Sequence, residues 1–187
     1  MNRVMFTLAA SPPAASPLAT MAIAGRGACA VAPSRVVEHM RLVTGKINGK
    51  PGWAKITNSS WTVHNGQTGT VQIVSFDDGS APFVGMYTQY TKVMGTINVK
   101  EVANGKSVIN VLDINVARTF SVPGLGFNMP IPVAATGDHI VVTASFVANK
   151  TGTFVWHDYA PCGSDTNGVA GATSTMDSMT GKVTVVG

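Results

Sequence analysis

The segment GTFVWHDYAPCGSDTNGVAGATSTMDSMTGKVTVVG (152–187) is the part of the chain that decides the fold. Residues 153–156 and 182–186 are rich in β-branched and aromatic side chains, which is typical of short strands. The loop between them contains Cys162 and two methionines. We therefore expect a strand, a long loop that carries sulfur atoms, and a final strand that closes the domain.

The residues upstream of this segment repeat the pattern of short strands and turns. Apolar residues alternate in several runs, and no long stretch has the helical period of about 3.6 residues. The run 36–44 fits either a short helix or an edge strand, and Asn104-Gly105 is a hairpin signature. The expected strands are 54–56, 61–63, 70–76, 93–99, 107–111, 118–122 and 139–148. Strands at roughly ten-residue spacing predict an all-β fold, a two-sheet Greek-key β-sandwich with an irregular N-terminal tail.

The composition limits the number of domains and the classes of partner. A chain of 187 residues corresponds to one domain, or to one domain and a tail. Its net charge of +4 comes from scattered lysines and arginines, whereas nucleic-acid surfaces cluster their cations. We therefore expect no nucleic-acid partner. The chain has no run of about 18 apolar residues, so we expect no membrane-spanning helix.

Residues 1–35 differ from the rest because they are rich in Ala, Pro, Ser and Met. They fit either an export signal or a disordered tail, and the folded domain would then span 36–187. Cys29 lies between two alanines, a pattern that fits a signal cleavage site. An export signal implies a periplasmic or extracellular location. Cys29 and Cys162 lie in segments of different character, so we expect no disulfide framework.

Catalytic motifs are missing from the sequence. It has no Gly-x-Ser-x-Gly nucleophile elbow, no zinc-protease motif and no phosphate-binding glycine loop after a strand. The stretch Asp77-Asp78-Gly79-Ser80 lacks the ligand spacing and the closing glutamate of a calcium loop, so we interpret it as a solvated turn. We therefore expect a protein that is not an enzyme.

Four stretches of the sequence, in this order, resemble the cupredoxin (blue-copper) domain. They are TVHNGQTGTVQIVSFDDG (62–79), ARTFSVPGLGFNMPIP (117–132), DHIVVTASFVANKTGTFVWHDYAPCG (138–163) and STMDSMTGKVTVV (174–186). The similarity extends over about residues 54–187. More narrowly, the chain is similar to exported cupredoxins related to the copper-binding domain of cytochrome c oxidase subunit II. The resemblance implies copper binding and one-electron transfer to a redox partner protein outside the cytoplasm.

The resemblance also implies which residues would bind the metal. A type 1 copper centre uses two histidines and one cysteine in a plane, with a weak axial methionine. Cys162 matches the thiolate ligand, and Met179 matches the axial ligand, with Met176 as the alternative. His157, five residues before Cys162, is the candidate imidazole. Each side chain also has a structural interpretation, as a small loop thiol, a core methionine and a strand-end histidine.

Two positions depart from the family pattern. Arg118 stands where the first histidine ligand is expected, and a guanidinium has no lone pair to give to a metal. Asp158 stands where related sequences often have a second cysteine. Adjacent residues of a strand point to opposite faces, so at most one of His157 and Asp158 can face the site.

These departures leave three hypotheses. The first is an exported copper protein that transfers electrons. The second is a metal-free module with the cupredoxin fold, which has lost its copper ligands and binds a partner or serves as a structural domain. The third is a Cu(I) carrier that uses the sulfur atoms of Cys162 and Met179. No role is assigned to His39, His64 or His139 from the sequence.

Overall fold

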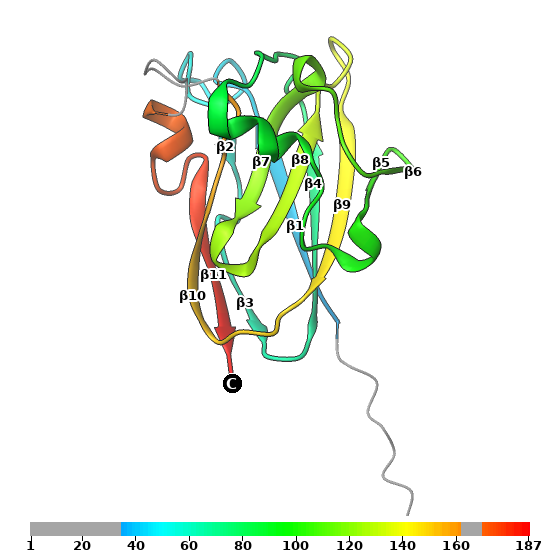
Figure 1. Cartoon of the computed structure of the whole chain (residues 1–187). Coiled ribbons are helices and arrows are strands. Elements are labelled where there is room, and N and C mark those ends of the chain that lie inside the picture. Colours follow the sequence, from blue (N-terminus) through cyan, green and yellow to red (C-terminus); the bar gives the residue numbers. More distant parts are fainter. Residues whose placement is uncertain (1–34, 162–169) are drawn as a thin grey trace, which may run out of the picture. The chain divides into compact units, whose positions relative to one another are not determined.

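Two β-sheets make up the computed structural model, which describes residues 35–161 and 170–187 (Figure 1). The first sheet has six strands in the order β2-β1-β4-β9-β5-β6. Its strands are β1 (Arg35–Val43), β2 (Lys55–Ile56), β4 (Thr68–Ser75), β5 (Glu101–Ala103), β6 (Lys106–Val108) and β9 (Ile140–Val147). Apart from Arg35, which begins β1, the expected N-terminal tail lies outside the described residues.

The second sheet has five strands in the order β3-β11-β10-β7-β8. Its strands are β3 (Ser60–His64), β7 (Val116–Val122), β8 (Phe127–Pro132), β10 (Gly152–His157) and β11 (Thr180–Val186). Both sheets are mixed, because β1 pairs with β4 and β3 pairs with β11 in parallel, while the other pairs are antiparallel. This arrangement confirms the predicted fold class, a cupredoxin-like β-sandwich.

Alternate residues of the strands fill the space between the two sheets. On β9, for example, Val142, Ala144 and Phe146 are buried, while the residues between them are partly exposed. Aromatic rings form the middle of this core, where Phe120 stacks on Trp156 with ring centroids 4.7 Å apart. The predicted alternation of strand residues therefore produces one continuous apolar core.

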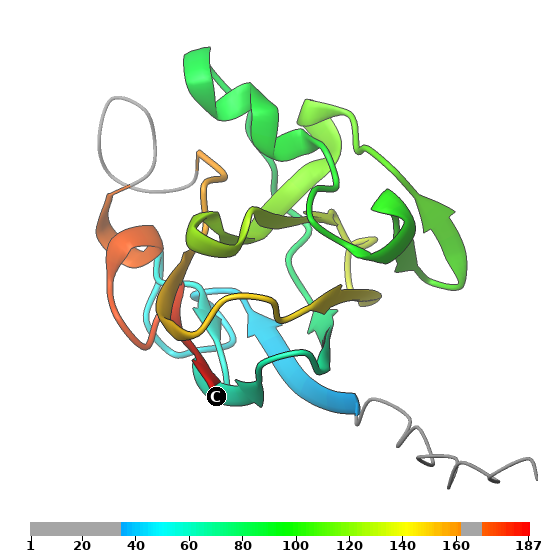
Figure 2. The same ribbon diagram turned by 60° about the horizontal axis from the view of Figure 1, so that its bottom comes forward.

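Short 3-10 helices and loops connect the strands. The 3-10 helix η1 (Gly85–Thr91) packs against β7 and β8, as the two views in Figures 1 and 2 show. The others are η2 (Ile97–Val99), η3 (Asp113–Asn115), η4 (Pro123–Leu125) and η5 (Gly171–Ser174). Across the two described ranges, the helices are too short to pass through a lipid bilayer.

The prediction of a strand at 93–99 is wrong. Val93 and Met94 make only isolated backbone hydrogen bonds, to Ile109 and Asn128, and the chain then turns through η2, in which Asn98 has a φ of 63°. Gly95 also has a positive φ, and an added Cβ atom there would lie 2.4 Å from the carbonyl oxygen of Gly126. The chain bends here because its backbone approaches a neighbouring turn that only the tertiary structure brings close.

The structure also decides the predictions made for the Asn104-Gly105 turn and for the run 36–44. The hairpin at Asn104-Gly105 is confirmed, with both residues at positive φ between β5 and β6. The run 36–44 is a strand, β1, and the helix alternative is wrong. Only Leu42 and Val43 of β1 pair with β2, so most of this strand forms an edge of the first sheet.

Candidate functional site

The candidate site lies at the end of the sandwich that is uppermost in Figure 1. The antiparallel pairing places the end of β4, the start of β7, the end of β10 and the start of β11 at this end. These four strand ends carry Asp77, Arg118, Asp158 and Met179 respectively. The strand order therefore brings together residues that are far apart in the sequence.

Arg118 is directed into this end of the core by its position on β7. Phe120 and Val122 of the same strand are buried in the core, and strand alternation places Arg118 on their face. The pairing of β7 with β8 shifts register between Val116 and Arg118, which is a bulge. Bulges change the direction of side chains near strand ends, and this one lies directly beside the guanidinium.

The guanidinium of Arg118 is held between two carboxylates. Its Nε lies 2.6 Å from Oδ2 of Asp77, and its Nη1 lies 3.5 Å from Oδ2 of Asp158. The three side chains are 12%, 6% and 0% exposed, in the order Arg118, Asp77, Asp158. We refer to these residues as the Arg118 cluster. Charged groups at this depth are normally paired, and here the arginine provides the only positive charge of the cluster.

Asp158 has the most complete set of partners in the Arg118 cluster. Its Oδ1 accepts hydrogen bonds from the backbone N–H of Thr119, at 2.8 Å, and of Ala160, at 2.9 Å. Burial raises the pKa of Asp158 to about 6, while Arg118 and the backbone N–H groups act to lower it and the charge of Asp77 acts to raise it. The carboxyl is therefore stabilised by partners against a large desolvation cost.

The interpretation of residues 77–80 as a solvated turn is wrong for its first residue. Asp77 is 4% exposed, and its Oδ1 accepts a hydrogen bond from the N–H of Gly79, while Oδ2 contacts Arg118. Asp78 and Gly79 are exposed, as expected of a turn. The turn is thus held to the core by its first carboxylate. The sequence does contain one signal of such a partner, an arginine within a strand of apolar and hydroxyl residues. If this strand is buried, the arginine needs an acidic partner.

His157 does not face the Arg118 cluster. It is opposite Ser121 in the β-ladder, while its neighbour Trp156 is buried in the core. The ring of His157 lies 5.6 Å from that of Tyr159, and burial lowers the pKa of the imidazole. Of His157 and Asp158, it is Asp158 that faces the Arg118 cluster.

All three tyrosines of the chain gather near His157 on the outer face of the second sheet. Tyr159 stacks on Tyr90 at 4.1 Å and on Tyr87 at 5.9 Å between ring centroids. Burial, followed by the proximity of Tyr90, raises the pKa of Tyr159 to about 12. His157 therefore belongs to an aromatic cluster under η1, on the far side of β10 from the Arg118 cluster.

Met179 is fully buried and is part of the main core. Its carbonyl oxygen accepts a hydrogen bond from the N–H of Asp158 at 3.1 Å, so its backbone adjoins the Arg118 cluster. Met176 is 42% exposed and does not share this burial. Cys162 lies outside the described residues. The structure thus places the backbone of Met179 next to Asp158, whereas His157 faces the other side of β10.

The remaining histidines have contacts of their own. Nδ1 of His39 lies 2.8 Å from Oε1 of Gln72 on the outer face of the first sheet. His139 lies 3.2 Å from the exposed carboxylate of Asp138. Within the described ranges, no three His, Cys, Asp or Glu side chains converge as a metal site would require. A type 1 copper centre needs two imidazoles beside its thiolate, and the expected thiolate, Cys162, lies outside the described residues.

Comparison with known proteins gives structural neighbours only. No family model matches the sequence, and no curated protein matches it. Two solved structures, one of substituted forms of rusticyanin and one of rusticyanin from Thiobacillus ferrooxidans, are 16% identical to this chain. In each case the match covers 82% of this chain and 79% of the other, with TM-scores of 0.37 and 0.35. At these scores, the fold assignment rests on the strand order described above.

Proposed function

We propose that this protein is a non-catalytic binding module with a cupredoxin-like fold, in which the Arg118 cluster occupies the place of a type 1 copper centre. The observation that carries the proposal is the guanidinium of Arg118 held between Asp77 and Asp158. This guanidinium stands at the position of the expected histidine ligand and is already neutralised by protein carboxylates. A copper ion there would lack this imidazole, because a guanidinium has no lone pair to give to a metal.

The Arg118 cluster also links the strand ends that a metal ion would otherwise hold together. Asp77 follows β4, Arg118 begins β7, and Asp158 follows β10, so the ion pairs and hydrogen bonds join both sheets. Breaking one partner of such a group leaves an uncompensated buried charge, which costs about 3 to 5 kcal/mol. This coupling supports a domain that keeps its fold without metal.

A second candidate function, Cu(I) binding by Cys162 and Met179, is favoured by one contact. The backbone of Met179 is hydrogen-bonded to that of Asp158, which precedes Cys162 by four residues. Thiolate and thioether ligands prefer the softer Cu(I) ion and do not require the missing imidazoles. Both candidates include export to the periplasm or the extracellular space, as residues 1–35 suggest, with 36–187 as the functional domain.

The two candidates and the copper-dependent electron-transfer hypothesis can be separated by metal retention. The full chain is titrated with Cu(II), and anaerobically with Cu(I), and the metal content is measured after dialysis against a chelator. We expect neither ion to be retained and no thiolate-to-copper absorption to develop. Cu(I) retention that is lost in both Cys162→Ser and Met179→Leu would instead select the carrier function. Intense absorption with Cu(II) would contradict the proposal.

The variant Arg118→His provides a sharper test of the geometry. It restores the expected first imidazole, and Arg118→Gln is the matched control that removes the charge without adding a ligand. We expect neither variant to form a coloured Cu(II) site, because His157 faces the aromatic cluster and a second imidazole is missing. A coloured site in the His variant alone would show that the second imidazole is in reach, contrary to the orientation described here.

A further inference from the structure

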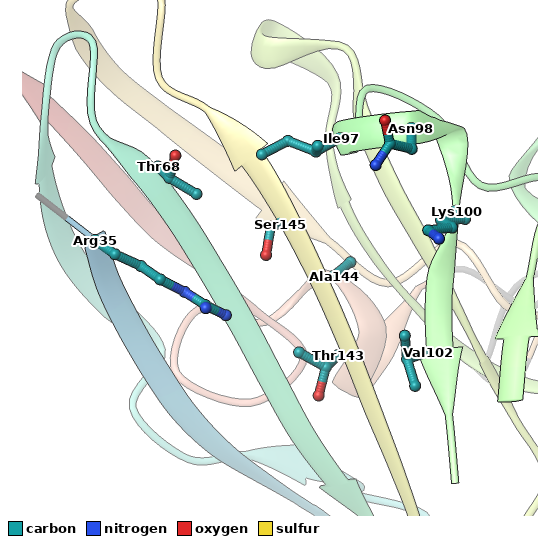
Figure 3. A pocket seen from close by; sticks show the side chains of 9 residues that line it. All are labelled: Arg35, Thr68, Ile97, Asn98, Lys100, Val102, Thr143, Ala144 and Ser145. Carbon is teal, nitrogen blue, oxygen red and sulfur yellow. The ribbon is translucent and has the colours of Figure 1, made fainter. Parts of the chain in front are cut away.

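A hollow of about 440 Å³ lies on the outer face of the first sheet, away from the core (Figure 3). Its floor is formed by β4 and β9, and its walls are formed by Arg35 of β1 on one side and by η2 and β5 on the other. The volume is within the range of about 300 to 1,000 Å³ that is typical of small-molecule sites. The Arg118 cluster contributes no residue to this hollow.

Two cationic side chains face this hollow, and no acidic side chain of the described chain lines it. Nε of Arg35 donates a hydrogen bond to Oγ1 of Thr70 at 3.0 Å, and Thr70 is in turn hydrogen-bonded to Ser145 at 2.8 Å. These two hydrogen bonds orient the guanidinium over β4. Its terminal NH₂ groups have no protein acceptor among residues 35–161 and 170–187. Lys100, on the opposite wall, has no ion pair or side-chain hydrogen bond in these ranges.

The floor and the wall between these cations offer hydroxyl and apolar groups. Oγ1 of Thr143 accepts a hydrogen bond from Nε2 of Gln72 at 3.3 Å, so its own O–H can donate toward the hollow. Ile97 and Val102 line the wall, and each is 39% exposed. The hollow therefore combines a hydroxyl donor and a modest apolar surface with two positive charges that form no ion pair with residues 35–161 or 170–187.

We propose that this hollow is a binding site for a small organic anion, whose phosphate or carboxylate groups are held by Arg35 and Lys100. Arginine and lysine recognise both kinds of anion, and the terminal NH₂ groups of Arg35 are available for one of them. Ile97 and Val102 would contact the carbon skeleton of the ligand. The site is open to solvent, so we expect dissociation constants of about 0.1 to 1 mM. The proposal goes beyond the Arg118 cluster and does not depend on whether copper is bound there.

The proposal is tested by titrating the ¹⁵N-labelled full chain with citrate and, separately, with inorganic phosphate at constant ionic strength. We expect saturable shifts of backbone amide resonances at 97–100 and 143–145, with citrate the tighter ligand because it carries three carboxylates and a carbon skeleton. Arg35→Gln combined with Lys100→Gln is expected to weaken citrate binding at least tenfold. Lys106→Gln combined with Lys182→Gln, which removes the same charge elsewhere, is the matched control and should leave the affinity unchanged.

Several outcomes would overturn this assignment. Shifts that are spread over the surface and do not saturate would show general ionic attraction only, as would equal weakening in both double variants. Binding of phosphate and citrate with equal affinity would show that Arg35 and Lys100 do not act together on one ligand. If the Arg35 variant unfolds, Lys100→Gln alone decides the question, because its ammonium makes no contact that folding would lose, and unchanged citrate affinity in it would refute the proposal.

Discussion

Two carboxyl groups, Asp158 at the end of β10 and Glu101 in β5, are almost equally hidden from solvent but differ in their partners. Counted over the whole residue, backbone included, Asp158 is 2% exposed and Glu101 is 1% exposed. Asp158 contacts Arg118 and two backbone N–H groups, whereas neither carboxyl oxygen of Glu101 has a hydrogen-bond partner within the described residues. The comparison separates the effect of burial from the effect of pairing within one molecule.

The pKa values of the two groups follow this difference. Burial alone raises the pKa of Glu101 to about 8, while the partners of Asp158 limit the rise of its pKa to about 6. In both cases the folded protein binds the proton more tightly than the unfolded chain does. Both groups therefore lower the free energy of unfolding as the pH rises. For Asp158 this decrease occurs between about pH 4 and pH 6, and for Glu101 it occurs between about pH 4.5 and pH 8.

The largest effect is expected for removal of the paired carboxyl. Asp158→Ala leaves the backbone N–H groups of Thr119 and Ala160 without this acceptor, and it leaves Arg118 with Asp77 alone. We expect the free energy of unfolding to fall by about 4 kcal/mol, measured by urea denaturation at neutral pH. The control is Asp138→Ala, an exposed carboxylate that should cost less than about 0.5 kcal/mol. Equal losses in the two variants would show that the pairing of Asp158 does not contribute to the free energy of unfolding.

A somewhat smaller effect is expected for removal of the cation. Arg118→Leu leaves Asp77 and Asp158 facing each other in the core, at a cost of about 3 kcal/mol near neutral pH. The cost should shrink as the pH falls from neutral towards 6, because Arg118 acts to lower the pKa of Asp158 and its removal lets this carboxyl take up a proton at a higher pH than in the parent protein. Urea denaturation at pH 5 and pH 7.5 measures this difference. Arg118→Lys, which keeps the charge, should recover part of the loss, and a pH-independent cost would argue against the ion pair.

The smallest effect, and the only gain, is expected for the unpaired carboxyl. Glu101→Gln removes the ionisation but keeps the shape, so the variant should be more stable than the parent protein by about 2 kcal/mol at pH 8. The gain should shrink as the pH falls and disappear well below pH 4.5, where the carboxyl is protonated in both folded and unfolded states. Thermal unfolding across this pH range provides the measurement. A gain that does not change with pH would mean that Glu101 does not titrate as an unpaired buried group.

The contrast between two loops explains how much of the fold was predictable. The hairpin at Asn104-Gly105 was predicted because the two residues themselves favour the positive φ that the turn requires. The bend at 95–99 was missed because it depends on the contact between Gly95 and the carbonyl oxygen of Gly126, two segments that are remote in the sequence. Local propensity decides the first loop, and tertiary contact decides the second.

The candidate site was predictable in part for the same reason. Arg118 was recognised because the resemblance to cupredoxins implies a histidine at this position, and strand alternation allowed only one of His157 and Asp158 to share its face. Asp77 was missed because its Asp-Asp-Gly-Ser context is that of an exposed turn, and its burial arises only where β4 meets β7. No local pattern identifies the partner of a buried ion.

Strand periodicity, turn residues and the apolar pattern are properties of neighbours along the chain, and they were enough to establish a two-sheet all-β sandwich. Three features depend on which parts of the chain become neighbours in space. They are the pairing of Arg118 with Asp77 and Asp158, the lack of a partner for Glu101 within the described residues, and the two cations around the outer hollow. These features depend on strand order and register, because only they set which charges meet and which remain alone. The charge arrangement of this β-sandwich is therefore a property of its tertiary structure.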